Sequence, residues 1–266
     1  MAESKKLSYL DILGNKFSDL KPEERKILVD QCQIEKRTYW LGTDKFGRDI
    51  LSRLIIGVRV SLSVGLISVG ISLFIGIFLG AVAGYFKGWL DGVIMWVINV
   101  FWSIPTLLLA MGLYIGAGSL IENKLVMIFI AVGLTMWVDT ARIVRGQFLS
   151  LREMEFVSAA KSLGFNNARI IFKHILPNIL GPIIVVACAN FASAILVESG
   201  LSYIGLGIQP PAPSWGSMLN EYKDFIDTNK AYLALFPGVA IMLLVLAFNL
   251  VGNGLRDALD VKGQLD

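Results

Sequence analysis

The chain has 266 residues, of which 55% are hydrophobic and 17% charged, and its net charge is +3. A soluble domain usually carries about a quarter charged residues, so this composition excludes an ordinary soluble enzyme and predicts an all-α integral membrane protein. The small positive charge is typical of a membrane topology bias rather than of a nucleic-acid surface. No nucleic-acid partner is therefore expected.

Residue usage also limits the chemistry. His174 is the only histidine, and Cys32 and Cys188 lie far apart, so neither a zinc site nor a catalytic triad is expected. The sequence contains no Gly-Lys pair and hence no P-loop. We expect no catalytic residue, metal or cofactor in this chain, and if ATP powers the protein, ATP and Mg²⁺ bind to another chain.

Residues 1–53 are polar, with no apolar stretch long enough to cross a bilayer and no signal-peptide core. Within them, the sequence LGTDKFGRD at residues 41–49 predicts a turn, because glycine and aspartate favour tight backbone. Asp44, Arg48 and Asp49 either form a local ion-pair network or are simply solvated. Chemistry alone favours the solvated turn, since surface ion pairs contribute little free energy.

A first membrane span is predicted at about residues 60–85, which is long enough to cross a bilayer. Small residues recur in it at every fourth position: Ser68, Ser72, Gly76, Gly80 and Gly84. Such spacing places them along one helix face, where a neighbouring helix can approach closely.

A second span is predicted at about residues 93–116. Pro105 lies in its middle and should kink or locally unwind the helix. Polar Asn99 and Ser103 lie nearby, and we consider all three residues candidates for a translocation path or gate. For Asn99, the alternative of a hydrogen bond to a neighbouring helix is equally compatible with the sequence.

A third span is predicted at about residues 125–144. Asp139 and Arg142 have the i,i+3 spacing of a helical ion pair near its end. We interpret this pair as an anchor at the membrane interface, with contact to a gating element as the alternative.

The fourth and last spans are predicted at about residues 177–198 and 232–250. Asn190 and Glu198 are polar members of the fourth span, and an ionisable residue there is a functional candidate by default. Both are therefore added to the candidates for the path or gate. The alternative for Glu198 is a position at the membrane interface.

Between the third and fourth spans, residues 155–178 have a helical pattern interrupted at Gly164. We expect two short helices, the first ending at this glycine and the second capped by Asn166 or Asn167. Pro177 then stands where the fourth span could begin.

This loop resembles the EAA loop of ATP-binding-cassette (ABC) importer permeases, in which two helices dock into the ATP-binding subunit. Ala159, Ala160, Gly164, Leu176 and Pro177 match that motif. Ser158 replaces the glutamate of the general motif, whereas Glu155 and His174 are similar to the peptide-importer version. The LGTDKFGRD sequence and the run at residues 199–219 also resemble the permeases of dipeptide, oligopeptide and nickel importers.

The resemblance implies a MetI-like, type I importer transmembrane domain at residues 54–252, in a multi-pass protein of the cell inner membrane. Its coupling loop, residues 145–176, and its tail, residues 253–266, would be cytoplasmic, and residues 1–53 extracytoplasmic. Related permeases usually carry one more span before the LGTDxxGRD signature, so we expect five spans here, with that first one missing.

The resemblance further implies a permease that moves peptides by alternating access and has no ATPase site of its own. Its partners would be a homologous second permease forming a heterodimer, two ATP-binding subunits, an extracytoplasmic solute-binding protein and membrane lipid. The implied ATPase-coupling residues are Glu155, Ala159, Ala160, Gly164, His174, Leu176 and Pro177. Alternatives are a nickel-chelate or glutathione permease of the same family and, in another class, an ion-coupled secondary transporter.

Overall fold

The computed structural model describes residues 39–118, 121, 123–208, 212–226 and 230–259. Within this part of the chain all regular structure is helical, and no strand is present. Four helices are long and apolar enough to cross a membrane, and a sharply bent helix pair could provide a fifth crossing. This agrees with the five expected spans and the all-α membrane fold.

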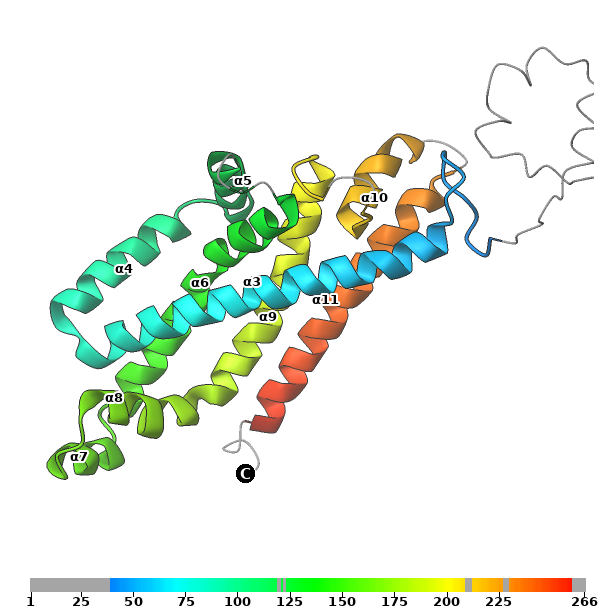
Figure 1. The fold of residues 1–266 in the computed structure, drawn as a ribbon. Coiled ribbons are helices and arrows are strands. Elements are labelled where there is room, and N and C mark those ends of the chain that lie inside the picture. Colours follow the sequence, from blue (N-terminus) through cyan, green and yellow to red (C-terminus); the bar gives the residue numbers. More distant parts are fainter. Residues whose placement is uncertain (1–38, 119–120, 122, 209–211, 227–229, 260–266) are drawn as a thin grey trace, which may run out of the picture.

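The first span is helix α3 (Ile50–Phe86), which begins well before the expected residue 60. Asp49 caps it, because its carboxylate accepts hydrogen bonds from the backbone amides of Leu51 and Ser52. Figure 1 shows α3 crossing α6, α9 and α11 along most of its length. The first turns of α3 were not included in the predicted span, because Arg53 and Arg59 make this segment more polar than the rest of the helix.

The stripe of small residues on α3 packs against α6 (Lys124–Leu151), as predicted. A Cβ atom added to Gly76 would lie 2.5 Å from Cβ of Thr140, and one added to Gly80 would lie 2.5 Å from the carbonyl oxygen of Ala141. These distances are far below van der Waals contact, so only glycine permits this approach. Helix α6 is consequently central: 61% of the most apolar 18-residue stretch of α6 is buried inside the molecule, against 17% for the corresponding stretch of α11.

The expected second span is divided in two. Helices α4 (Gly88–Trp102) and α5 (Thr106–Ala117) meet at an angle of 94°. Pro105 lies at the bend and precedes the first residue of α5, because its ring cannot continue α4. The predicted kink is thus a sharp elbow.

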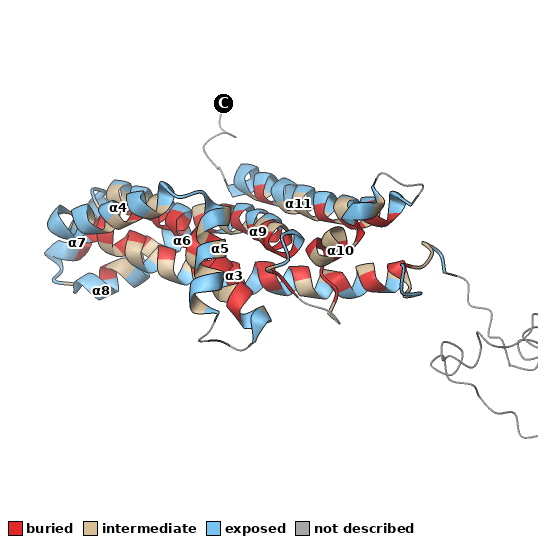
Figure 2. Ribbon diagram, turned by 90° about the horizontal axis from the view of Figure 1, so that it is seen from above, coloured by how far each residue is buried: buried red, intermediate tan, exposed pale blue. Residues whose placement is uncertain are grey.

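The remaining long helices are α9 (Leu180–Tyr203) and α11 (Tyr232–Leu259), with the short helix α10 (Trp215–Tyr222) between them. Helix α11 continues well past the expected end of the last span at residue 250. Residues 253–259, the first part of the expected tail, therefore extend this helix. In Figure 2 most of the outer surface of α11 is exposed, as suits a helix facing lipid or another subunit.

The helix bundle has two ends, which we name by what they carry. The loop end holds α7 (Glu155–Ser162) and α8 (Asn167–Arg169), together with the end of α3 and the end of α11. The turn end holds residues 39–49 and α10, as Figure 1 shows. The connection between α3 and α4 and the last described turns of α11 thus lie at the same end of the bundle, and the assignment of that end to the cytoplasm stays a prediction.

Candidate functional site

The break after α7 has the hydrogen bonds of a Schellman motif. Leu163 is the C-cap residue of α7, and Gly164 follows with φ +75°. The Gly164 amide donates to the Lys161 carbonyl at 2.9 Å, and the Phe165 amide donates to the Ala160 carbonyl at 3.2 Å. The left-handed backbone favours glycine, so the predicted helix break at Gly164 is confirmed.

Asn166, rather than Asn167, caps the next helix. Its side-chain oxygen accepts a hydrogen bond from the Arg169 amide at 2.8 Å. From Asn167 the chain then stays helical through to Tyr203, passing through a π-helical turn (Ile170–Ile175) and a 3-10 turn (Leu176–Ile179) before α9.

The helix that contains the fourth span therefore does not begin at Pro177, contrary to expectation. This proline lies inside a continuous helical path that starts at α8. Proline has no amide hydrogen to donate and its ring crowds the preceding turn, so the helix adapts locally by changing its winding instead of ending.

The loop is held to the bundle by an apolar core. Val157, Ala160, Ile170 and Ile175 are buried there together with side chains of α3 and α6. The Tyr85 hydroxyl at the end of α3 also donates to the Asn167 side chain at 2.8 Å. Helix α7 is thus attached firmly to the long helices.

The two adjacent alanines face different ways, because successive residues on a helix are about 100° apart. Ala160 is 4% exposed and belongs to the core, whereas Ala159 is exposed. Of this pair, only Ala159 has its methyl group on the surface, and Ala160 has a packing role that the sequence did not distinguish.

The outer surface of the loop carries three large exposed apolar side chains. Exposed fractions are 41% for Phe156, 72% for Leu163 and 67% for Phe172. Glu155 and Pro177 are exposed beside them, and Leu176 is half-buried. Exposed apolar groups on a projecting element are typical of a protein-binding surface. We call this surface, formed by residues 155–177, the coupling face.

His174 lies beneath the coupling face. Its ring stacks on Phe165 with 5.7 Å between ring centroids. Its Nε2 atom is buried and has no hydrogen-bond partner in the part of the chain that the structure describes. A role of His174 in coupling would therefore act through the packing of the loop.

Sequence reasoning missed the ion pairs that close the loop end. Arg145 on α6 holds Asp91 on α4 with two hydrogen bonds of 2.5 and 2.7 Å. Lys87 pairs with Glu153 at 2.7 Å, and this hydrogen bond lowers the pKa of Glu153. The partners are more than 50 residues apart, so no local sequence pattern indicated them.

The gate candidates near the elbow are exposed. Asn99 accepts a hydrogen bond from Arg142 at 3.1 Å, and the Ser103 hydroxyl donates to the Val100 carbonyl at 2.7 Å. The Arg142 guanidinium also lies 3.6 Å from the ring centre of Trp102. The predicted Asp139–Arg142 ion pair is not among the described contacts, because Arg142 reaches across to α4 instead.

The other two candidates are buried. Asn190 donates to Ser72 at 3.3 Å and to Thr140 at 3.1 Å, and so joins α9 to α3 and α6. Glu198 is 0% exposed and accepts a hydrogen bond from Ser202 at 2.7 Å. Glu198 is thus enclosed within the subunit, and its position at the membrane interface stays a prediction. Whether the gate candidates line a path stays a prediction.

At the turn end, the LGTDKFGRD segment is folded by its own polar groups. One Asp44 oxygen accepts hydrogen bonds from the amides of Phe46 and Arg48, both at 2.9 Å. The other accepts from the Arg48 side chain at 2.6 Å. Burial opposes ionisation of Asp44, but these hydrogen bonds outweigh it and lower its pKa.

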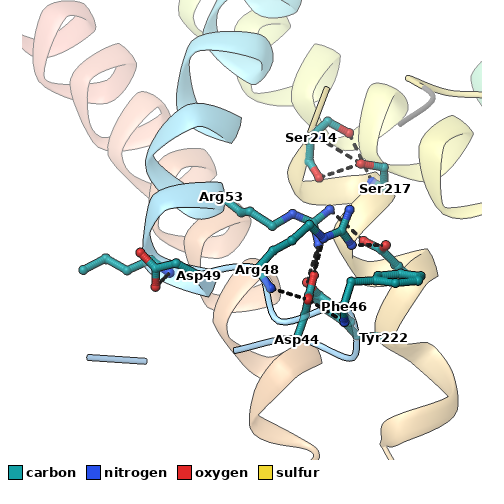
Figure 3. A network of polar contacts seen from close by, with 10 residues as sticks. Asp44, Phe46, Arg48, Asp49, Arg53, Ser214, Ser217 and Tyr222 are labelled. Atoms are coloured by element: carbon teal, nitrogen blue, oxygen red, sulfur yellow. Dashed lines mark hydrogen bonds and ion pairs between the residues drawn. The ribbon is translucent and has the colours of Figure 1, made fainter. Parts of the chain in front are cut away.

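The ion pair between Asp44 and Arg48 is one of the predicted contacts, and the solvated turn is wrong. Asp49 does not join it and caps α3 instead, as Figure 3 shows. No local pattern indicated the further partners, Glu221 and Tyr222, because α10 lies about 170 residues away.

Comparison with known proteins identifies a family to which this chain is similar. Residues 76–262 match the model of the family described as binding-protein-dependent transport system inner membrane component. The chain is 46% identical to the dipeptide transport system permease protein DppC of Alkalihalophilus pseudofirmus, over 94% of this chain and 79% of that protein. It is also 46% identical to the glutathione transport system permease protein GsiD of Salmonella typhimurium, over 84% of this chain and 72% of that protein.

A solved structure gives the same picture of the fold. A chain of the MetNI methionine ABC transporter, in an inward-facing conformation, superposes with a TM-score of 0.66 at 18% identity, covering 79% of this chain and 97% of that one. A match at this identity shows the fold alone. With the membrane-spanning helices and the loop between α6 and α9, these findings establish that the chain belongs to the family of binding-protein-dependent inner membrane components, the permeases of ABC importers.

Proposed function

We propose that this permease carries peptides, dipeptides first, across the cytoplasmic membrane by alternating access, driven by separate ATPase subunits. The coupling face is the observation that supports it most directly, because this projecting surface has exposed Phe156, Leu163 and Phe172 and a rigid attachment to the bundle. The identity with the dipeptide permease supports the substrate class.

The proposed assembly contains a homologous second permease, two ATP-binding subunits and an extracytoplasmic solute-binding protein. The coupling face would lie in the cytoplasm against an ATP-binding subunit, and the turn end would face the binding protein. ATP and Mg²⁺ would bind to the ATPase subunits, since the sequence of this chain has no P-loop.

The geometry provides a route for coupling. Movement of the ATPase would push on α7, whose core residues Val157 and Ala160 pass the displacement to α8 and to the helical path that continues into α9. That path reaches from the coupling face to Glu198 near the turn end. Two packings of the bundle with different contacts to ATPase and binding protein would then interconvert during the cycle.

The experiment that tests this proposal is reconstitution of the complex in liposomes with its binding protein. Retained ligand is identified by mass spectrometry, and uptake of labelled dipeptide, longer peptide, glutathione and nickel chelate is compared. ATP-dependent uptake of dipeptide above the other solutes supports the proposal.

Uptake of glutathione alone would favour the second candidate, which the equal identity to the glutathione permease supports. Uptake that is independent of ATP but follows an ion gradient would overturn the importer mechanism in favour of a secondary transporter.

A further inference from the structure

We propose that Asp44, Arg48, Arg53, Glu221 and Tyr222 form a clasp that keeps the N-terminal turn, the start of α3 and α10 together as one rigid body throughout transport. In this role they are positioning residues, which keep α10 seated over the Glu198 region of α9. The statement that the clasp stays closed throughout the transport cycle rests on the transport function proposed above. The contacts that form the clasp do not depend on which substrate is carried.

Arg53 is the centre of the clasp. Its Nη1 atom donates to Asp44 at 2.8 Å and to the Tyr222 hydroxyl at 2.5 Å, and its Nη2 atom donates to Glu221 at 2.7 Å. The guanidinium thus joins three partners from two segments, and Figure 3 shows these side chains converging. A planar fork of donors can do this, whereas a lysine ammonium acts as a point charge.

Arg48 makes the arrangement a closed ring. It pairs with Asp44 and with Glu221, so each arginine contacts both carboxylates. Two positive and two negative charges therefore balance within the cluster. The Asp44 side chain is 0% exposed and that of Arg53 10% exposed, so removal of one member leaves a poorly solvated charge without its partner.

The clasp fixes α10 from the side of α3. Trp215, the first residue of α10, adds a hydrogen bond from its indole nitrogen to the Leu54 carbonyl at 3.0 Å, and its ring fills the space above Gly57. Ser214 and Ser217 form a capping box that sets where α10 begins. The start of α3 and the whole of α10 are therefore joined by both polar and apolar contacts.

On its other side α10 covers α9. A Cβ atom added to Gly216 would lie 2.6 Å from Cα of Ser199, and the Ser214 and Ser202 hydroxyls are 3.4 Å apart. Ser202 in turn donates to the buried Glu198. Because the clasp holds α10 here, it keeps Ser199 and Glu198 away from water. A clasp that stays closed also implies that the turn end does not open between α10 and the start of α3.

The test uses Ser199→Cys in the assembled complex, with Cys32 and Cys188 replaced by serine, and a water-soluble maleimide as the probe. With the clasp intact, labelling should be slow both without nucleotide and with a trapped ATP analogue. Glu221→Gln should raise the labelling rate at least tenfold. Arg53→Lys should also raise it, although the net charge is unchanged, because one ammonium cannot replace the fork.

Asp224→Asn is the matched control, since this exposed carboxylate lies next to α10 outside the clasp and its loss should change nothing. The double variant Arg53→Gln/Glu221→Gln restores charge balance and should label more slowly than Glu221→Gln alone. Solute moved per ATP hydrolysed should fall in the Glu221→Gln and Arg53→Lys complexes that still assemble and melt normally.

Two results would overturn the proposal: labelling that is unaffected by the clasp variants, or fast labelling of the intact clasp when the ATP analogue is bound. Labelling needs no substrate. Failure of the complex to take up peptide would therefore count against the proposed function and leave the clasp to be judged by its own result.

Discussion

Gly164 combines an unusual backbone with empty surroundings. Its φ is +75°, and a Cβ atom built there would meet nothing within 4 Å. A side chain thus costs conformational energy, about 1 kcal/mol or somewhat more for a left-handed residue, but its Cβ atom would clash with none of the described residues. Any larger effect of a substitution must come from a partner that approaches the coupling face.

Gly164→Asp should abolish ATP-driven transport while the protein stays in the membrane at a normal level. Gly164→Asn is the matched neutral variant, since asparagine tolerates the left-handed conformation better than most residues, and it should fold with little loss of stability yet still impair transport. Uptake assays and the amount of ATPase that copurifies provide the measurement. Normal uptake in a well-expressed Gly164→Asp variant would contradict docking at this residue.

Single residues also show what local sequence can predict. Gly164 could be identified, and the following cap limited to Asn166 or Asn167, because a helix end depends on the few residues around it. Ala160 was not separated from Ala159, since which face of α7 is buried depends on α3 and α6. The burial of Asn190 among three helices likewise depends on contacts between distant segments.

At the scale of elements, the contact between α3 and α6 depends on residues without side chains. Gly76→Ala should destabilise the permease by about 1–3 kcal/mol, the usual cost of overpacking, because the new methyl group would meet both Thr140 and the Trp137 carbonyl. Gly70→Ala is the control on the same helix, since a Cβ atom there meets nothing within 4 Å. Thermal unfolding in detergent measures the difference, and equal melting temperatures would refute the close approach.

The attachment of α4 to α6 can be tested by a double-mutant cycle. Arg145→Gln or Asp91→Asn alone leaves a half-buried charge without its partner. The stability losses of the two single variants should therefore add up to more than the loss in the double variant. The coupling should be about 1 kcal/mol or more, because the pair has two short hydrogen bonds. Strictly additive melting shifts would show that the pair is solvated and contributes nothing.

The elements themselves were largely predictable, but their ends were not. Hydrophobic length locates the membrane spans, and Pro105 indicated the elbow. The first turns of α3 and the helix running through Pro177 were missed, because tertiary contacts at the two ends of the bundle support backbone that composition alone assigns to loops.

At the scale of the whole molecule, the turn end should respond to acid. The folded pKa of Asp44 is lowered, so its contribution to stability is present above the unfolded value of about 4 and is lost as pH falls through the folded value. Limited proteolysis of the purified complex should therefore show the N-terminal turn released in acid and protected at neutral pH.

Asp44→Asn is the control for this titration. It should weaken the turn end already at neutral pH, and proteolysis of the turn should then change less between about pH 5 and pH 3. Acid sensitivity equal to that of the unmodified chain would assign the effect to other carboxylates.

The length of α9 has a geometric consequence. Its 24 residues span about 36 Å at 1.5 Å per residue, so a tilt of about 8° that leaves one tip in place sweeps the opposite tip through about 5 Å. A small stroke at one membrane surface would thus reach the other as a displacement the size of an amino-acid side chain, and the π-helical and 3-10 turns before α9 mark where its winding changes.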